Sequence, residues 1–198
     1  MPVDAPLSLP RFVVATLALL PVAFAVWYFT APVLLWPAQI LAEFVLKAGF
    51  AGLFSGFESD GYTLRALTTL KPGQAVAGGA ISVDVNMLLY AYGLPMFAAL
   101  VVAAREPRWP RILLLGFLAI LPFVAWGIVA DVLKSIAIGA GPAVASQTGF
   151  GAPAREAIAF AYQFGALILP TVVPAAAWVL THRGFLERMR TAGGTRAP

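Results

Sequence analysis

Cysteine is absent from the 198-residue sequence, and histidine occurs once, at His182. The first absence excludes disulfides, thiolate catalysis and cysteine metal sites, and the second excludes a site with several histidine ligands. Charge is also scarce, at 11% of residues, whereas soluble globular chains carry about 25%. Because 61% of the residues are hydrophobic, the chain needs an apolar solvent, and we expect an integral membrane protein.

Four long apolar runs divide the chain. Each is long enough for a helix of about 20 residues to cross about 30 Å of hydrocarbon. We therefore predict a single membrane domain over residues 1–198. Its spans are predicted at about 12–31, 86–104, 112–133 and 156–181. The first run also resembles a signal peptide, with Ala23-Phe24-Ala25 as a small-x-small site, but its apolar residues continue beyond that point, which favours a retained anchor.

Basic residues cluster at one end of each predicted span. Four crossings place the clusters on the same side of the membrane, which is cytoplasmic by the positive-inside rule. We expect a multi-pass protein of the bacterial inner membrane with both termini in the cytoplasm. The basic tail is expected to touch anionic headgroups rather than nucleic acid. The residues concerned are Arg11, Arg105, Arg108, Arg111, Arg183, Arg188, Arg190 and Arg196.

The exported loop, about 38–84, holds most of the remaining polar residues. Its first part predicts an amphipathic helix with apolar and polar residues on opposite faces. Residues 62–70 and 80–85 are typical of two strands joined by a loop, that is, a β-hairpin. A lone hairpin is marginal in water, so it must pack on the helix, the bilayer or a partner. The apolar face is Ile40, Leu41, Phe44, Val45 and Ala48, and the polar face is Gln39, Glu43 and Lys47. The predicted fold class is an all-α membrane protein of four transmembrane helices with this small exported α+β element between spans one and two.

Candidate site residues lie where the second predicted strand passes into the second span. Asn86 is suited to cap the helix, and Tyr90 and Tyr92 suit the headgroup level. Gly93 and Pro95 loosen the helix, since proline cannot donate to residue 91. A capped and kinked helix explains all five residues, and the alternative is a cleft at the outer membrane face.

Asp131 and Lys134 are spaced to pair across one helical turn at the outer end of span three. An interfacial ion pair explains them, and contact with a substrate or partner is the alternative. No ionisable residue lies deep within a predicted span, which disfavours transport of charged substrates. Because His182 is predicted on the cytoplasmic side, away from the exported acids, no catalytic set is expected, and neither a metal nor a cofactor.

The stretch "VDVNMLLYAYGLPMFAALVVAAR", which begins at Val83, resembles the exosortase H-associated membrane proteins. The overall layout of an anchor, a small exported loop and three further spans agrees with this resemblance. Exosortases are membrane transpeptidase-like enzymes that recognise C-terminal sorting signals and use a catalytic cysteine. The resemblance therefore implies an accessory role beside exosortase H for this cysteine-free chain. It supplies no catalytic residues.

These observations predict a non-enzymatic scaffold of an envelope protein-sorting system. Its expected partners are the membrane, a membrane sortase-like protein and, in second place, lipid; nucleic acid is not expected. The working surface is expected at the exported loop and the outer end of span two. The alternative is a small membrane enzyme or carrier that acts on a lipid-like substrate in a cleft near Asn86 and Tyr90.

Overall fold

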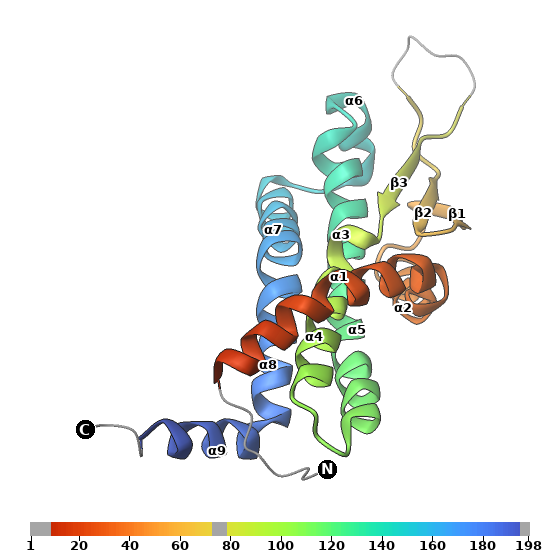
Figure 1. Ribbon diagram of the computed structural model, residues 1–198. Coiled ribbons are helices and arrows are strands. Elements are labelled where there is room, and N and C mark those ends of the chain that lie inside the picture. Colours follow the sequence, from red (N-terminus) through yellow and green to blue (C-terminus); the bar gives the residue numbers. More distant parts are fainter. Residues whose placement is uncertain (1–8, 73–78, 195–198) are drawn as a thin grey trace. The chain divides into compact units, whose positions relative to one another are not determined.

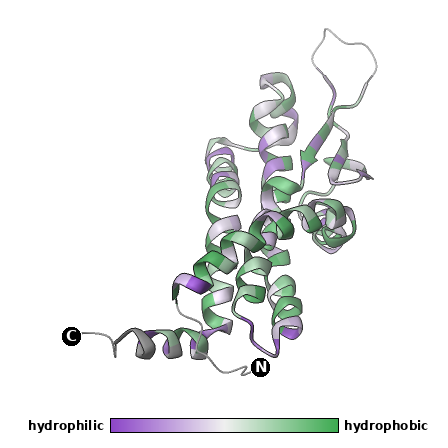
Figure 2. Ribbon diagram, in the orientation of Figure 1, coloured by the Kyte–Doolittle hydropathy of each residue, from purple (hydrophilic) through white to green (hydrophobic). Residues whose placement is uncertain are grey.

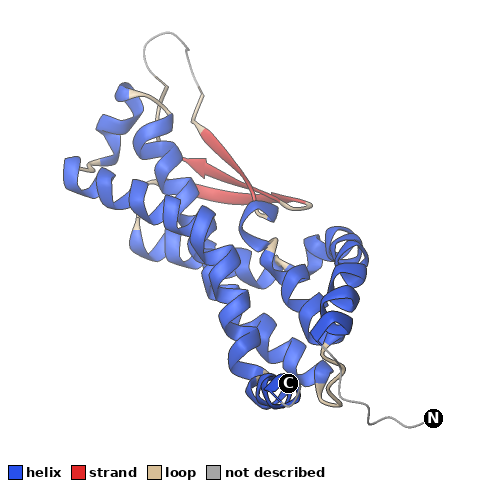
Figure 3. Cartoon of the chain, turned by 60° about the vertical axis from the view of Figure 1, so that its left-hand side comes forward, coloured by secondary structure: helices blue, strands red, loops and turns tan. Residues whose placement is uncertain are grey.

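The computed structural model describes residues 9–72 and 79–194. Helices dominate this part of the chain, and three strands stand beside them (Figure 3). The chain forms two compact units, one of residues 1–29, 92–120 and 171–198 and one of residues 30–91 and 121–170. We call them the terminal unit and the sheet unit. Helices α1 (Leu9–Leu34), α5 (Trp109–Lys134) and α8 (Leu169–Thr181) contribute residues to both.

The sheet has three antiparallel strands in the order β1-β2-β3. The predicted hairpin is present as β2 and β3, which pair antiparallel, and β1 is an additional strand that was not predicted. The strands are β1 (Phe54–Asp60), β2 (Thr63–Thr68) and β3 (Ser82–Asn86). Strand β1 is poor in strand-forming residues and contains the acidic segment that suggested a turn. It exists because it pairs with β2 along its length, and the turn itself lies at Gly61, whose φ is +59°. Most of the predicted loop between β2 and β3, residues 73–78, lies outside the described residues.

The inner face of the sheet is apolar. Strands β2 and β3 alternate buried and exposed residues, as a half-buried strand does. Leu64 and Ala66 of β2 are fully buried, as is Val85 of β3. The opposite face carries the polar residues, so the sheet presents a polar surface on the side away from its core.

Helix α2 (Trp36–Gly49) confirms the predicted amphipathic helix, and it is the side of small and polar residues that is buried. Its buried residues are Ala38, Gln39, Ala42 and Leu46. The predicted apolar face stays largely exposed, with Phe44 at 66%. Small side chains at 38 and 42 allow close packing there, whereas the large apolar side chains stay at least partly exposed.

Helix α2 lies next to strand β1 (Figure 1), and residues of its polar face make the contact. Ser59 Oγ donates a hydrogen bond of 3.0 Å to Gln39 Oε1, and Gln39 Nε2 donates one of 2.8 Å to Glu43. The Lys47 ammonium lies 5.2 Å from the centre of the Phe57 ring, within cation–π range. The sheet therefore packs on α2, which was one of the three possibilities for the exported strands.

The remaining helices of the sheet unit are short or irregular. They are α3 (Leu88–Ala91), the π-helix η1 (Ser135–Gly139), α6 (Pro142–Ala145), the 3-10 turn η2 (Ser146–Thr148), α7 (Ala152–Gln163) and the π-helix η3 (Phe164–Ile168). Gln147 ties η2 to the chain beyond β2: its amide nitrogen donates to the Lys71 carbonyl at 2.9 Å, and its oxygen accepts from the Lys71 N–H at 3.0 Å. Gly165 of η3 approaches Gly127 of α5 so closely that a Cβ on Gly165 would lie 3.1 Å from Gly127 Cα. Glycine at both positions thus permits backbone-to-backbone packing of the two helices.

The terminal unit contains α4 (Gly93–Ala103) and α9 (Arg183–Gly194) beside its parts of α1, α5 and α8. Phe97 of α4 is 2% exposed and occupies the space that a side chain at Gly116 of α5 would need. The α4–α5 turn and α9 lie at the same end of this unit (Figure 1). Exposed arginines gather in this unit at the start of α1, in the α4–α5 turn and in α9: Arg11, Arg105, Arg108, Arg111, Arg183 and Arg190.

Within residues 9–72 and 79–194, three helical runs are long and apolar enough to cross a membrane: Leu9–Leu34, Trp109–Gly139 and Ala152–Thr181. Figure 2 shows their mainly hydrophobic colouring. They correspond to predicted spans one, three and four. The predicted span 86–104 is the shorter apolar run Leu88–Ala103, which is interrupted at Tyr92. Four crossings therefore stay a prediction.

Candidate functional site

Asn86 ends strand β3 and begins the helical segment. Its Oδ1 accepts a hydrogen bond of 3.0 Å from the Leu88 N–H, which is one of the N–H groups that a helix start leaves unpaired. The Met87 N–H donates to the Tyr62 carbonyl at 3.0 Å, which holds the chain to β2 at this point. The exposed Asn86 side chain therefore has a structural role as a cap.

Tyr90 is 2% exposed and packs its ring against Gly127 of α5. A Cβ at Gly127 would lie 2.6 Å from Tyr90 Cγ, so only glycine leaves room for the ring. The buried hydroxyl interacts electrostatically with Asp131 and Tyr162 without reaching the geometry of a hydrogen bond. A buried hydroxyl in this state is able to form one more hydrogen bond, which is costly to leave unmade.

Asp131 and Lys134 meet as the sequence predicts. Lys134 Nζ lies 3.3 Å from Asp131 Oδ1 and 4.2 Å from the centre of the Tyr162 ring. The Asp131 side chain is only 14% exposed and the Lys134 side chain 30%, so the pair is mostly screened from solvent. With Tyr90, these residues form what we call the polar cluster, at the junction of α3, α5 and α7. It offers a hydroxyl, a carboxylate and an ammonium group but no nucleophile paired with a base.

Tyr162 also belongs to the polar cluster, but the sequence does not single it out. It lies late in α7, and nothing in the local pattern distinguishes it from an ordinary interfacial tyrosine. Its role follows from the packing of α7 on the end of α5, which brings its ring under the Lys134 ammonium. Only a tertiary contact identifies it.

Tyr92, Gly93 and Pro95 belong to the terminal unit, whereas Asn86, Tyr90, Asp131 and Lys134 belong to the sheet unit. The helix is interrupted at Tyr92, and α4 begins at Gly93. Pro95 has no N–H to continue the α3 hydrogen-bond ladder, which is the expected reason for the break. Neither pocket described below is lined by Asn86, Tyr90 or Tyr92.

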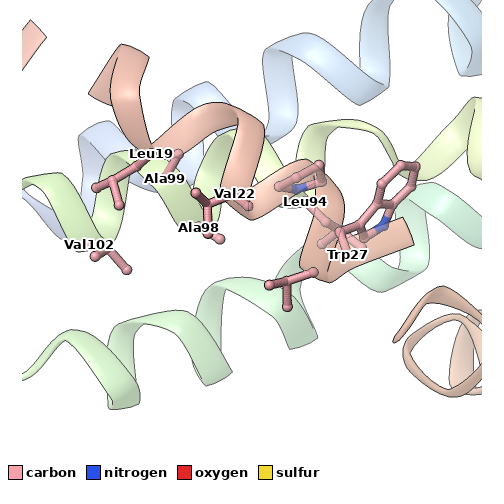
Figure 4. Close-up of a pocket in the computed structure, with 10 residues that line it drawn as sticks. Leu19, Val22, Trp27, Leu94, Ala98, Ala99 and Val102 are labelled. Atoms are coloured by element: carbon pink, nitrogen blue, oxygen red, sulfur yellow. The ribbon is translucent and has the colours of Figure 1, made fainter. Parts of the chain in front are cut away.

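An apolar groove of about 310 Å³ lies between α1 and the first turns of α4 in the terminal unit (Figure 4). We call it the α1–α4 groove. Alanines at 23, 98 and 99 leave the space, and Leu94, Pro95 and Trp27 wall one end of it. Every side chain that lines the groove is hydrophobic, so it can receive hydrocarbon or an apolar side chain but cannot perform polar chemistry.

The outer face of the sheet carries a row of charges across its strands. Glu58, Arg65 and Asp84 are opposite one another in the strand register. Arg65 forms a bidentate pair with Asp84, with Nε at 2.8 Å and a terminal nitrogen at 3.1 Å. The hydrogen bond from Arg65 lowers the pKa of Asp84, and Asp60 adds a third acid to the face. The face has three carboxylates and one arginine, so it is acidic.

His182 lies within a cluster of aromatic rings in the terminal unit. Its ring stacks on Trp178, with 5.2 Å between centres, and Trp178 stacks on Phe12 at 5.5 Å. Phe185 closes the cluster. The histidine is 1% exposed, its Nδ1 lies 3.1 Å from the Trp178 carbonyl, and its Nε2 is buried without a hydrogen-bond partner among the described residues. Burial therefore lowers the pKa of His182, against weaker opposing effects of that carbonyl and of Glu106.

Acidification from pH 7 to pH 5 is expected to lower the free energy of unfolding through His182. The lowered pKa means that the unfolded chain binds a proton at a pH where the folded chain does not, so stability rises with pH in this window. His182→Phe is expected to flatten the profile, because it removes the only histidine of the sequence. Unfolding in detergent followed by tryptophan fluorescence at each pH measures both proteins. An unchanged slope in the variant would contradict the assignment.

The apolar helices and the scarcity of charge define the class: this is a membrane protein. Within that class, the family of exosortase H-associated membrane proteins matches residues 6–185, and the chain belongs to this family. The match covers nearly the whole chain and confirms the resemblance seen at Val83 to Leu100. Neither a curated protein nor a solved structure matches the chain.

Proposed function

We propose that the protein is a non-catalytic accessory subunit of a bacterial exosortase-type system for envelope protein sorting. The family match over residues 6–185 carries this proposal. The sequence contains no cysteine, so the chain does not perform a cysteine-based sorting reaction itself. The polar cluster lacks a nucleophile with a paired base, which also supports a binding role over a catalytic one.

The proposed topology has four crossings of the inner membrane and both termini in the cytoplasm. The exposed arginines of the terminal unit support this orientation, since basic residues concentrate in cytoplasmic loops. The sheet then lies on the exported side. Helix α2 supports it there, with its large apolar residues free to enter the outer face of the bilayer.

Two surfaces are proposed to contact a membrane sortase-like partner. The first is the acidic outer face of the sheet, which suits a basic region outside the hydrocarbon. The second is the α1–α4 groove, which runs along span two from Leu94 to Val102 and whose alanines permit close approach of a partner helix. A polar contact contributes orientation, and an apolar contact contributes affinity. Asn86 is exposed on the same side of β3 as Asp84, and its hydrogen bond to the Leu88 N–H gives it a structural role as a cap.

Co-purification in mild detergent tests the proposal. The tagged chain, co-expressed with the exosortase of the same genome, is expected to recover that enzyme. Ala23→Phe fills the groove and is expected to lower recovery about tenfold, which corresponds to about 1.4 kcal/mol at a contact. Ala25→Phe is the matched control, because it adds the same ring at an exposed position of the same helix outside the groove.

The acidic face is tested by the double substitution Glu58→Lys and Asp60→Lys. It is expected to reduce recovery further and to make the residual binding less sensitive to salt. Recovery of no exosortase by the unmodified chain would overturn the proposed function. Equal losses in the Ala23 and Ala25 variants would remove the groove from the contact surface while leaving the partnership in place.

A further inference from the structure

A second apolar pocket, of about 340 Å³, lies within the sheet unit between α2, α5 and α7. Its floor is buried: Ala125 and Ala130 of α5 are 2% and 3% exposed, and Ile158 of α7 is 9% exposed. Leu41 of α2 and Trp126 of α5 form a partly exposed rim, so the pocket is open to the surroundings. We call it the α2–α5–α7 pocket.

The walls of the pocket have a fixed shape, and none of their side chains needs a hydrogen-bond partner from a ligand. The one polar atom of the Trp126 side chain, Nε1, already donates to the Ala161 carbonyl at 3.1 Å, which holds the indole in place and ties α5 to α7. The other side chains that line the pocket are hydrocarbon. A ligand here gains only apolar contact, so its bound portion must be an apolar chain or side chain.

Arg155 places a cation on the same side of α7 as the pocket. Arg155, Ile158 and Ala161 follow one another at three-residue spacing, which places them along one face of the helix. The Arg155 Nε donates to the Phe150 carbonyl at 3.0 Å, and the Phe150 ring meets edge-on the ring of Phe50, which lines the pocket. The guanidinium is thus fixed near the pocket. No carboxylate in the described ranges lies within ion-pair distance of it.

We propose that the α2–α5–α7 pocket binds one acyl chain of an anionic phospholipid, and that Arg155 contacts its phosphate. Two of the three walls come from helices that are apolar enough to cross a membrane, so the rim faces hydrocarbon. A chain in the pocket with its phosphate at Arg155 combines the two chemistries that the site offers: apolar burial and a charge-assisted hydrogen bond. An apolar side chain from a partner would use only the first of these. The proposal does not depend on the proposed sorting function.

Photo-cross-linking of the purified full-length protein in mild detergent tests the site. The probes are phosphatidylglycerol and phosphatidylcholine, each with a diazirine near the end of one acyl chain. Labelling of residues 122–133 and 158–161 is quantified by mass spectrometry. Phosphatidylglycerol is expected to label these peptides about fivefold more than phosphatidylcholine, the ratio that corresponds to about 1 kcal/mol for one arginine at an anionic lipid surface.

Matched variants separate the two parts of the site. Arg155→Gln is expected to abolish the preference for the anionic lipid, whereas Arg155→Lys keeps the charge and most of the preference. Ala161→Phe fills the pocket and is expected to reduce labelling by both probes. Ala157→Phe, one turn earlier at an exposed position outside the pocket, is expected to leave it unchanged. The Arg155 variants affect only an exposed side chain, so they test the site even where the Ala161 variant does not fold.

Three results would overturn the proposal. The first is uniform labelling of all exposed apolar helices by both probes, unaffected by any variant, which is the behaviour of bulk lipid. The second is a preference for phosphatidylglycerol that persists in Arg155→Gln. The third is a pocket that neither probe labels because a co-purified protein segment occupies it.

Discussion

Replacement of Gly127 by alanine is expected to lower the free energy of unfolding by about 2 kcal/mol. Alanine gains about 1 kcal/mol over glycine in a helix interior. The new Cβ, however, would lie 2.6 Å from Tyr90 Cγ and closer still to Cδ1, where no real Cβ sits. These atoms are the root of a buried ring, so the ring cannot move aside without displacing α3. Overpacking of this kind costs about 3 kcal/mol, which exceeds the gain.

Gly139→Ala is the matched control for this prediction. It lies farther along the same helical run, where the nearest atom to a new Cβ is a backbone oxygen at 4.0 Å. It is expected to be neutral or stabilising. Unfolding of the purified variants by denaturing detergent, followed by tryptophan fluorescence, measures the differences. A Gly127→Ala protein as stable as the Gly139→Ala protein would show that Tyr90 does not pack as described.

Replacement of Gly116 by alanine is expected to cost about 1–2 kcal/mol in the terminal unit, again after the gain in helix propensity. Here the new Cβ would meet the tip of the Phe97 ring, 3.1 Å from Cε2 and nearer to Cζ and Cε1. Phe97 is 2% exposed, so its ring has no free space to enter. The cost is smaller than at Gly127, because a ring tip shifts more easily than a ring root.

A shorter side chain at position 97 distinguishes this mechanism from a general loss of stability. Phe97→Leu removes the ring atoms that the new Cβ would meet. In the double variant the two substitutions are therefore expected to be less destabilising than the sum of the single ones. The same unfolding measurement gives the coupling. Additive effects would mean that Gly116 and Phe97 do not share this contact.

The sequence predicts the elements that depend on local pattern. Uncharged runs of sufficient length predicted three of the apolar helices. The position of Asn86 at the end of an alternating stretch predicted that it caps the helical segment that follows. Asp131 and Lys134 pair because they are one turn apart on a single helix. Each of these features is fixed by residues close in sequence, so pattern alone is enough.

What the sequence did not reveal depends on contacts between distant residues. Strand β1 has weak strand propensity and exists through its partner β2. Helix α2 turns its small and polar residues inward because Ser59 and Phe57 of β1 contact them, and the pattern of α2 alone does not predict this contact. Tyr162, the burial of His182 and both apolar pockets likewise arise from helix packing.

Helix α2 also sets the height of the sheet. Its polar side contacts β1 and its large apolar side chains point elsewhere, so about one helix diameter, about 10 Å, separates the strands from whatever those side chains enter. In the proposed topology this is the thickness of the headgroup layer. A binding protein anchored in the same bilayer then meets the acidic strands by lateral diffusion in two dimensions. Its orientation relative to the membrane is already fixed when it arrives. Anchoring in the bilayer has already restricted the orientation of both proteins, so their association loses less orientational entropy than it would in solution.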